Sequence, residues 1–155
     1  MMYIIEHIHW NQIQPVWRYN LWPDRQSPIE SHSAMTWPFN NDQEPYEMSV
    51  FDYKPFFIGA VLDNKLIGVN SGHRSSSNHF RSRGLWVDPD HRKHGIAQML
   101  FAETERLAKS EGSDMIWSVP RKTALSAYQR FGFETVGDFF GTETAESNIY
   151  VIKQL

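Results

Sequence analysis

The longest regular pattern of apolar and polar positions in this chain lies between residues 96 and 109. Apolar residues recur there three or four positions apart, with polar residues between them, which predicts an amphipathic helix. Lys109 in the last turn and Gly112 after it are typical of a helix end. The apolar run Leu85–Val87, closed by Asp88-Pro89-Asp90, predicts that a strand and a turn precede this helix.

Shorter patterns predict the rest of the fold. Apolar runs predict strands at residues 2–8, 56–62, 66–73, 80–87, 115–119, 133–140 and 148–154. Helical spacing predicts further helices at residues 11–21, 27–37 and 121–131. The helix at 27–37 depends on Ser27-Pro28-Ile29-Glu30, which combines an N-cap serine, a first-turn proline and a glutamate three positions after the cap. Strand 115–119 follows a helical crossover, so we expect it to pair in parallel with strand 80–87.

Composition narrows the class of protein. The chain has 155 residues, of which 41 % are hydrophobic and 14 % aromatic, so we expect one globular domain over residues 1–155. No apolar run approaches the ~18 residues of a membrane span, and the net charge of −3 argues against a nucleic-acid partner. The absence of cysteine excludes disulfides and thiolate zinc sites. We expect no metal, because His7 and His9 lack a third ligand at a suitable spacing. With no charged leader at the start of the chain, a cytoplasmic location is expected.

The loop before the central helix suits an anion. A helix start offers free N–H groups and partial positive charge, Gly95 allows close approach to the backbone, and Arg92 and Lys93 add full charges. A diphosphate is the natural ligand of such a loop. The same residues are also compatible with a plain solvated helix start.

Two motifs in this part of the chain resemble the signatures of the GCN5-related N-acetyltransferase (GNAT) superfamily. Arg92-Lys93-His94-Gly95-Ile96-Ala97 is similar to its Arg/Gln-x-x-Gly-x-Gly/Ala signature, and residues 124–133 (ALSAYQRFGF) are similar to Ala-x-x-x-Tyr-x-x-x-Gly-Phe. The resemblance covers residues 56–140. It implies an α/β fold with a mixed, mostly antiparallel sheet of about seven strands, helices on both faces, and a splay between strands 4 and 5.

The same resemblance implies how acetyl-CoA binds as co-substrate. The backbone of Leu85, Trp86 and Val87 would pair with the amides of the pantetheine arm, as at an open strand edge. The pyrophosphate would lie against the N–H groups of Arg92, Lys93, His94, Gly95, Ile96 and Ala97. Arg121 departs from the family pattern, because it stands where an asparagine is often found; its charge suits a CoA phosphate. Ser118, at the end of its strand, is a candidate hydrogen-bond partner of the pantetheine arm.

Catalysis needs a polarised thioester carbonyl, a base and an acid. The N–H of Val87 is expected to polarise the carbonyl. Tyr128 matches the family tyrosine and is expected to protonate the leaving sulfur; the alternative is a purely packed tyrosine. Strand 80–87 carries no carboxylate, which some family members use as base. His73 and His79 are therefore candidate bases. Glu44 and Glu47, in the acidic loop of residues 39–55, are other options.

Residues 24–54 hold six acidic and two basic side chains. This excess predicts a wall that recognises a cationic amine, for which Trp37, Glu44 and Glu47 are candidate contacts. The alternative is a solvated surface segment.

The function expected from this resemblance is transfer of an acetyl group to a primary amine of a small molecule or peptide, by direct attack. Because strand 4 lacks a carboxylate, a non-catalytic acyl-CoA-binding regulatory module is the alternative; an anion-binding protein without CoA is a third. The family also implies a homodimer through the final strands.

Overall fold

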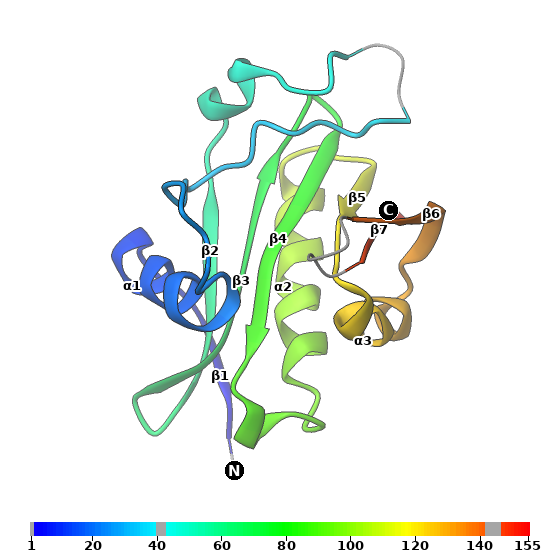
Figure 1. Ribbon diagram of the computed structural model, residues 1–155. Helices are drawn as coiled ribbons and strands as arrows, with labels where there is room; N and C mark the ends of the chain where they lie inside the picture. Colours follow the sequence, from blue (N-terminus) through cyan, green and yellow to red (C-terminus); the bar gives the residue numbers. More distant parts are fainter. Residues whose placement is uncertain (1, 40–42, 142–146) are drawn as a thin grey trace.

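The computed structural model describes residues 2–39, 43–141 and 147–155 (Figure 1). Within them, seven strands form one sheet in the order β1-β2-β3-β4-β5-β7-β6. The strands are β1 (Ile4–His7), β2 (Phe56–Leu62), β3 (Lys65–Arg74), β4 (His79–Val87), β5 (Met115–Ser118), β6 (Glu134–Phe140) and β7 (Asn148–Gln154). All neighbours are antiparallel except β4 and β5, which are parallel. The predicted fold class and the parallel pairing are thus confirmed.

The helices cover both faces of the sheet. They are α1 (Trp10–Val16) and the π-helical turn η1 that continues it (Trp17–Leu21), α2 (Ile96–Ser110), α3 (Leu125–Phe131) and the 3-10 turns η2 (Met48–Asp52), η3 (Pro89–His91) and η4 (Lys122–Ala124). α1 and η1 lie on one face and α2 on the other (Figure 1). No helix in the described ranges is long and apolar enough to span a bilayer.

Each face has its own apolar core, because the strands alternate their side chains between the two faces. On the α2 face, Leu100 and Phe101 are buried with Ile58 of β2 and Ile116 of β5. On the α1 face, Ile13 and Trp17 are buried with Val69 of β3. The apolar stripe along α2, visible in the sequence, is the surface that this helix buries.

The helix predicted at 27–37 is wrong. No helix is present there, and Met35 instead forms an isolated antiparallel bridge with Tyr46. The backbone carbonyl of Glu30 accepts a hydrogen bond from Arg83 Nη1 (2.7 Å), and the N–H of Ser33 donates to His73 Nε2 (3.2 Å). Contacts with β3 and β4 therefore satisfy backbone groups that a helix would have used internally, and tertiary context overrides the local capping signal.

Candidate active site

The sheet opens between β4 and β5. Their parallel ladder consists of three pairs and ends at Arg81↔Trp117. β5 stops at Ser118, whereas β4 continues to Val87. From Ser82 onward, one edge of β4 therefore has no neighbouring strand to accept its backbone hydrogen bonds. The splay expected between strands 4 and 5 is present, and its apex lies at Arg81.

β4 also carries a bulge beside this opening. Val69 pairs with Trp86 and Ser71 with Arg83, so two residues of β4, Gly84 and Leu85, oppose the single residue between Val69 and Ser71. Gly84 has φ +78°, and its carbonyl accepts a hydrogen bond from Trp17 Nε1 (2.8 Å). The bulge thus fixes how the end of β4 leaves the sheet.

The loop that joins β4 to α2 is open around its backbone. Lys93 and Gly95 both have left-handed φ values, +67° and +79°, and Gly95 is the N-cap of α2. A Cβ added at Gly95 would meet no atom within 4 Å, so the backbone at the N-cap is not covered by other side chains. The first N–H groups of the helix have no acceptor inside it. Arg92 Nε donates to the carbonyl of Val87 (3.1 Å) and brings positive charge to the end of β4. This geometry fits a diphosphate.

A buried polar cluster stands at the apex of the splay. Ser118 Oγ and Arg81 Nε both donate to the carbonyl of Ser82, at 2.7 and 3.0 Å. The Tyr128 side chain, 4 % exposed, is hydrogen-bonded to Ser118, and burial raises its pKa. Because the Ser118 proton goes to Ser82, its oxygen is left to accept the proton of Tyr128. Tyr128 and Ser118, two residues predicted from the sequence, thus meet here, and the phenol remains protonated at neutral pH.

His73 is fully buried below the segment that precedes η2. Its Nδ1 is 2.9 Å from the carbonyl of Arg74 and its Nε2 accepts from the N–H of Ser33, which defines the neutral tautomer. Burial lowers the pKa of His73 to about 3, opposed by the hydrogen bond to Arg74. The His32 ring packs 4.9 Å away. With both ring nitrogens engaged, this geometry favours a structural role for His73.

The other candidate residues are spread out. His79 starts β4 and pairs with Met115, at the closed end of the ladder and away from its open end; burial lowers its pKa, opposed by Asp114. Trp37 is buried, with its ring 5.7 Å from that of Trp117. Glu44 is exposed and its N–H donates to Glu47 Oε1 (3.4 Å). The acidic loop is thus a surface feature here, whereas Trp37 belongs to the core cluster behind β5.

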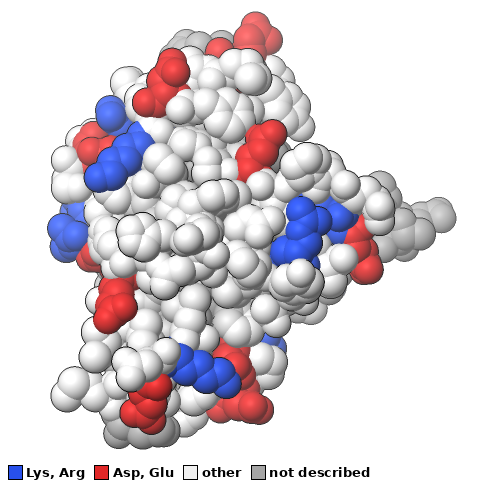
Figure 2. Space-filling view, turned by 90° about the vertical axis from the view of Figure 1, so that its left-hand side faces the viewer, with Lys and Arg blue, Asp and Glu red and all other residues white. Residues whose placement is uncertain are grey.

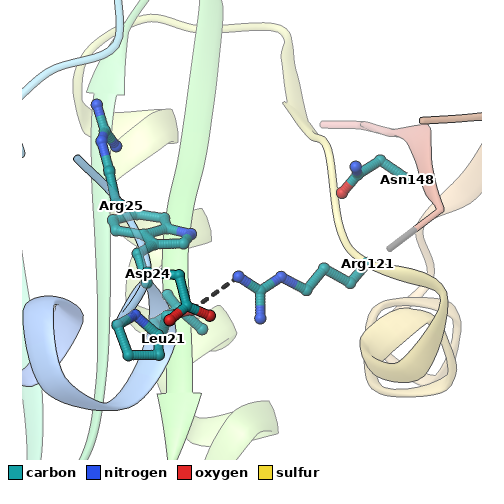
Figure 3. A pocket seen from close by; sticks show the side chains of 7 residues that line it. Leu21, Asp24, Arg25, Arg121 and Asn148 are labelled. Carbon is teal, nitrogen blue, oxygen red and sulfur yellow. Dashed lines mark hydrogen bonds between the residues drawn. The ribbon is translucent and has the colours of Figure 1, made fainter. Parts of the chain in front are cut away.

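A pocket of about 500 Å³ opens in front of the splay (Figure 3). Residues from both sides of the opening line it, including Trp22, Asp24, Arg25, Arg121 and Asn148. Arg121 Nη2 donates to the carbonyl of Leu21 (2.7 Å), so this arginine extends across the opening. The sequence prediction assigned Arg121 to a CoA phosphate, which stays a prediction.

Sequence reasoning missed Arg81 and Arg83 on β4 beside the opening, and Asp24 and Arg25 in the lining of the pocket. A signal was present for the first two, because residues two apart on a strand share a face. Asp24 was counted only as part of the acidic segment. Its place beside the pocket depends on how η1 packs against β4, through contacts such as that between Trp17 and Gly84.

The comparisons with known proteins agree with this architecture. Among solved structures, an aminoglycoside 6'-N-acetyltransferase complexed with coenzyme A has a TM-score of 0.68 at 15 % identity, covering 97 % of this chain and 96 % of that one. A GNAT family acetyltransferase from Elizabethkingia anophelis with acetyl-CoA bound has a TM-score of 0.60 at 13 % identity, covering 99 % and 98 %. An acetyltransferase from Bacillus cereus ATCC 14579 has a TM-score of 0.61 at 23 % identity, covering 66 % and 74 %. At these identities the likeness shows the fold.

No curated protein sequence matches this chain significantly. Residues 17–133, more than half of the chain, match the acetyltransferase (GNAT) family. This match includes β2 to β5, the loop before α2 and the segment that carries Tyr128. The chain therefore belongs to the GNAT family of acetyltransferases.

Proposed function

We propose that this protein transfers an acetyl group from acetyl-CoA to a primary amine of a small molecule or peptide, by direct attack of the amine. The observation that carries the proposal is the buried hydroxyl of Tyr128, hydrogen-bonded to Ser118 where β4 and β5 separate. A protonated phenol at the apex of an open strand pair is placed to serve as a general acid.

The residues around the opening fit the co-substrate. The unpaired edge of β4 at Leu85, Trp86 and Val87 would hold the pantetheine amides, and the N–H groups of residues 92–97 would hold the pyrophosphate. When bound, acetyl-CoA supplies the thioester whose acetyl group is transferred. Two similar structures contain coenzyme A or acetyl-CoA, which supports this choice of donor.

Within this proposal, Tyr128 gives its proton to the departing sulfur as the C–S bond breaks. Ser118 orients the phenol, because its own proton is committed to the carbonyl of Ser82. The Arg81 guanidinium favours the phenolate that remains, since its charge opposes the rise in the pKa of Tyr128 that burial causes. The acid, its positioning residue and a nearby positive charge thus lie in one cluster.

The amine must lose a proton before it attacks. β4 carries Arg81 and Arg83 rather than a carboxylate, and His73 uses both ring nitrogens in hydrogen bonds. The pocket in front of the splay is open to solvent. We therefore assign this step to water in the pocket rather than to a side chain of β3 or β4; the carboxylate of Asp24 lines the same pocket.

The test is a thiol-release assay with acetyl-CoA and a broad amine panel, run beside calorimetric binding of CoA. The proposal expects CoA binding and amine-dependent thiol release. CoA binding without turnover on any amine would contradict transfer. It would favour a non-catalytic acyl-CoA-binding module, the candidate that the missing β4 carboxylate supports. A protein that does not bind CoA would contradict both.

A further inference from the structure

Two elements from opposite sides of the splay form the pocket in front of β4. Trp22, Asp24 and Arg25 follow η1, which packs against β4. Arg121 follows β5 and reaches across to the carbonyl of Leu21 (Figure 3). Hence the pocket lies over the opening on the face that carries α1, whereas Tyr128 belongs to the core beneath α2 on the opposite face. An acceptor can enter from this side without displacing the backbone loop at Arg92–Ala97.

Arginine side chains concentrate around this pocket. The guanidinium carbons of Arg25 and Arg83 lie 5.6 and 5.2 Å from the centre of the Trp22 ring, which itself lines the pocket. Repulsion between the two guanidinium groups contributes to lowering the pKa of Arg83, after burial and the charge of Arg81. The Leu21–Arg25 segment thus carries one arginine, Arg25, and is contacted by two others, Arg83 and Arg121. Asp24 is the carboxylate that lines the same pocket.

Arg81 extends this positive charge to the apex of the splay. Its side chain is 8 % exposed, stacks 4.6 Å over the Trp117 ring, and shares a strand face with Arg83. Its Nη1 is buried and has no hydrogen-bond partner among the described residues. Burial lowers the pKa of Arg81 to about 10, so the group is still charged at neutral pH. A buried cation of this kind is costly unless something negative approaches it.

Charged groups are dispersed over the face of the molecule that Figure 2 shows. Figure 2 shows the face turned a quarter from Figure 1, where positive and negative side chains of the described residues alternate and form no continuous basic field. The arginine cluster is thus a local property of the pocket and the strand beneath it.

We propose that this pocket selects an acceptor amine that also carries an acidic oxyanion group, either a carboxylate or a phosphate, held by Arg25 and Arg121. Asp24 offers a partner for the ammonium end of the same molecule. The inference rests on the proposed transferase function and specifies its acceptor. It differs from the sequence-based expectation of an acidic wall for a purely cationic amine, because Glu44 and Glu47 lie on the acidic loop and do not line this pocket.

The first experiment compares amines that differ only in the negative charge. A panel of L-amino acids is assayed against the corresponding carboxamides, with thiol release from acetyl-CoA as the readout. We expect kcat/KM to be at least tenfold higher for the acids. Removal of the carboxylate lowers the pKa of the ammonium and makes more free amine available, so basicity alone would favour the carboxamides.

A second pair of amines distinguishes a carboxylate site from a phosphate site. Phosphoethanolamine is compared with ethanolamine, and spermidine serves as the purely cationic amine. If the site binds a carboxylate, the ratio of kcat/KM between the acidic and neutral amine should be larger for the amino-acid pairs. If it binds a phosphate, that ratio should be larger for phosphoethanolamine and ethanolamine. A preference for spermidine over both acids would overturn the proposal.

Variants that remove one positive charge test which arginines cause the preference for acidic amines. Arg25→Gln and Arg121→Gln are expected to raise KM for the acidic amine at least tenfold and to change KM for its neutral partner less than twofold. Lys109→Gln, on the exposed end of α2, removes the same charge away from the pocket and should change neither. If Arg121→Gln instead weakens CoA binding and leaves acceptor selectivity intact, Arg121 belongs to the co-substrate and its role here is refuted.

Measuring acceptor binding without turnover tests the acceptor preference independently of the transferase function. Calorimetric titration of the CoA-loaded protein with an amino acid and its carboxamide measures selection without turnover. Tighter binding of the acid, lost in Arg25→Gln, supports the proposal even if no amine is acetylated, in which case only the transferase function fails. Equal binding of the two, tighter binding of the carboxamide, or no binding of any acid in the panel would overturn it.

Discussion

The two sides of the splay are built from different chemical groups. The side proposed to hold the cofactor (the cofactor side, residues 85–97) offers main-chain N–H and C=O groups at an open strand edge and at the start of α2. The side proposed to hold the acceptor (the acceptor side, residues 17–39 and 43–53) offers side chains. Among them, the Trp17 ring packs on Arg83 of β4 and the His32 ring on His73 of β3. The first side depends on backbone conformation and the second on side-chain identity.

This difference explains why one side is easy to recognise and the other is not. A diphosphate is bound by any helix start with the right backbone, so its sequence requirement is short and local. An acceptor is selected by charges and rings brought together from distant segments, such as Trp22, Arg83 and Arg121. Family membership therefore predicts the donor more directly than the acceptor.

The largest expected effect concerns Tyr128, the buried phenol at the apex of the splay. Tyr128→Phe removes the proton donor and should lower kcat about 100-fold, at the lower end of the range for general acids, with KM for acetyl-CoA within twofold. Tyr3→Phe is the matched control, because the Tyr3 hydroxyl is buried without a hydrogen-bond partner in the described part of the chain. An unchanged kcat in Tyr128→Phe would show that the apex does not act through this side chain.

Gly84 of β4 lies against the Trp17 ring of the acceptor side. We expect it to be the glycine at which an added side chain destabilises the protein most. An added Cβ would lie 2.3 Å from the Trp17 ring, at φ +78°, so both overpacking and backbone strain apply. We expect Gly84→Ala to lower the free energy of unfolding by roughly 3 kcal/mol, measured by urea denaturation. Gly112→Ala has nearly the same φ and open space, and should cost only about 1 kcal/mol. Equal losses would mean that Trp17 does not pack tightly against β4.

Because of His73, we expect the free energy of unfolding to fall at acidic pH. Its folded-state pKa of about 3 lies below the ordinary value of 6.5, so the unfolded chain binds more protons between these two pH values and stability falls as pH falls from 6.5 towards 3. Between pH 7 and pH 5, the free energy of unfolding is expected to fall by about 2 kcal/mol.

Urea denaturation at both pH values measures this loss. His73→Gln retains hydrogen-bonding groups but does not titrate, and should reduce the pH dependence by that amount. His9→Gln, at an exposed position, is the control. A pH dependence that is the same in His73→Gln and the parent protein would contradict the assignment.

The smallest expected effect is a difference in CoA binding between alanine variants of two glycines. Gly95 and Gly112 stand at opposite ends of α2 with the same φ of +79° and no atom near an added Cβ. Both alanine variants should lose about 1 kcal/mol of stability. Only Gly95→Ala should also weaken CoA binding, by about tenfold or 1.4 kcal/mol, because its Cβ would occupy the space over the helix start. Equal CoA affinities in the two variants would place the diphosphate elsewhere.

Much of the fold followed from local patterns. The apolar period of α2 and the crossover to β5 were each decided by residues close in sequence, and the structure confirms them. The segment at 27–37 has an equally good local signal but no helix. There, the carbonyl of Glu30 is bound by Arg83, fifty-three positions away, and no local pattern contains that partner.

By itself, the sequence determined the GNAT architecture and the backbone loop at the start of α2, because glycine conformation and helix periodicity act over a few residues. The pocket proposed for the acceptor depends on the tertiary structure. Asp24 and Arg121 are far apart in the chain and line the same pocket, in front of the sheet where it opens at Arg81↔Trp117. Long-range packing places their charges, and a pattern read along the chain carries no information on such distances.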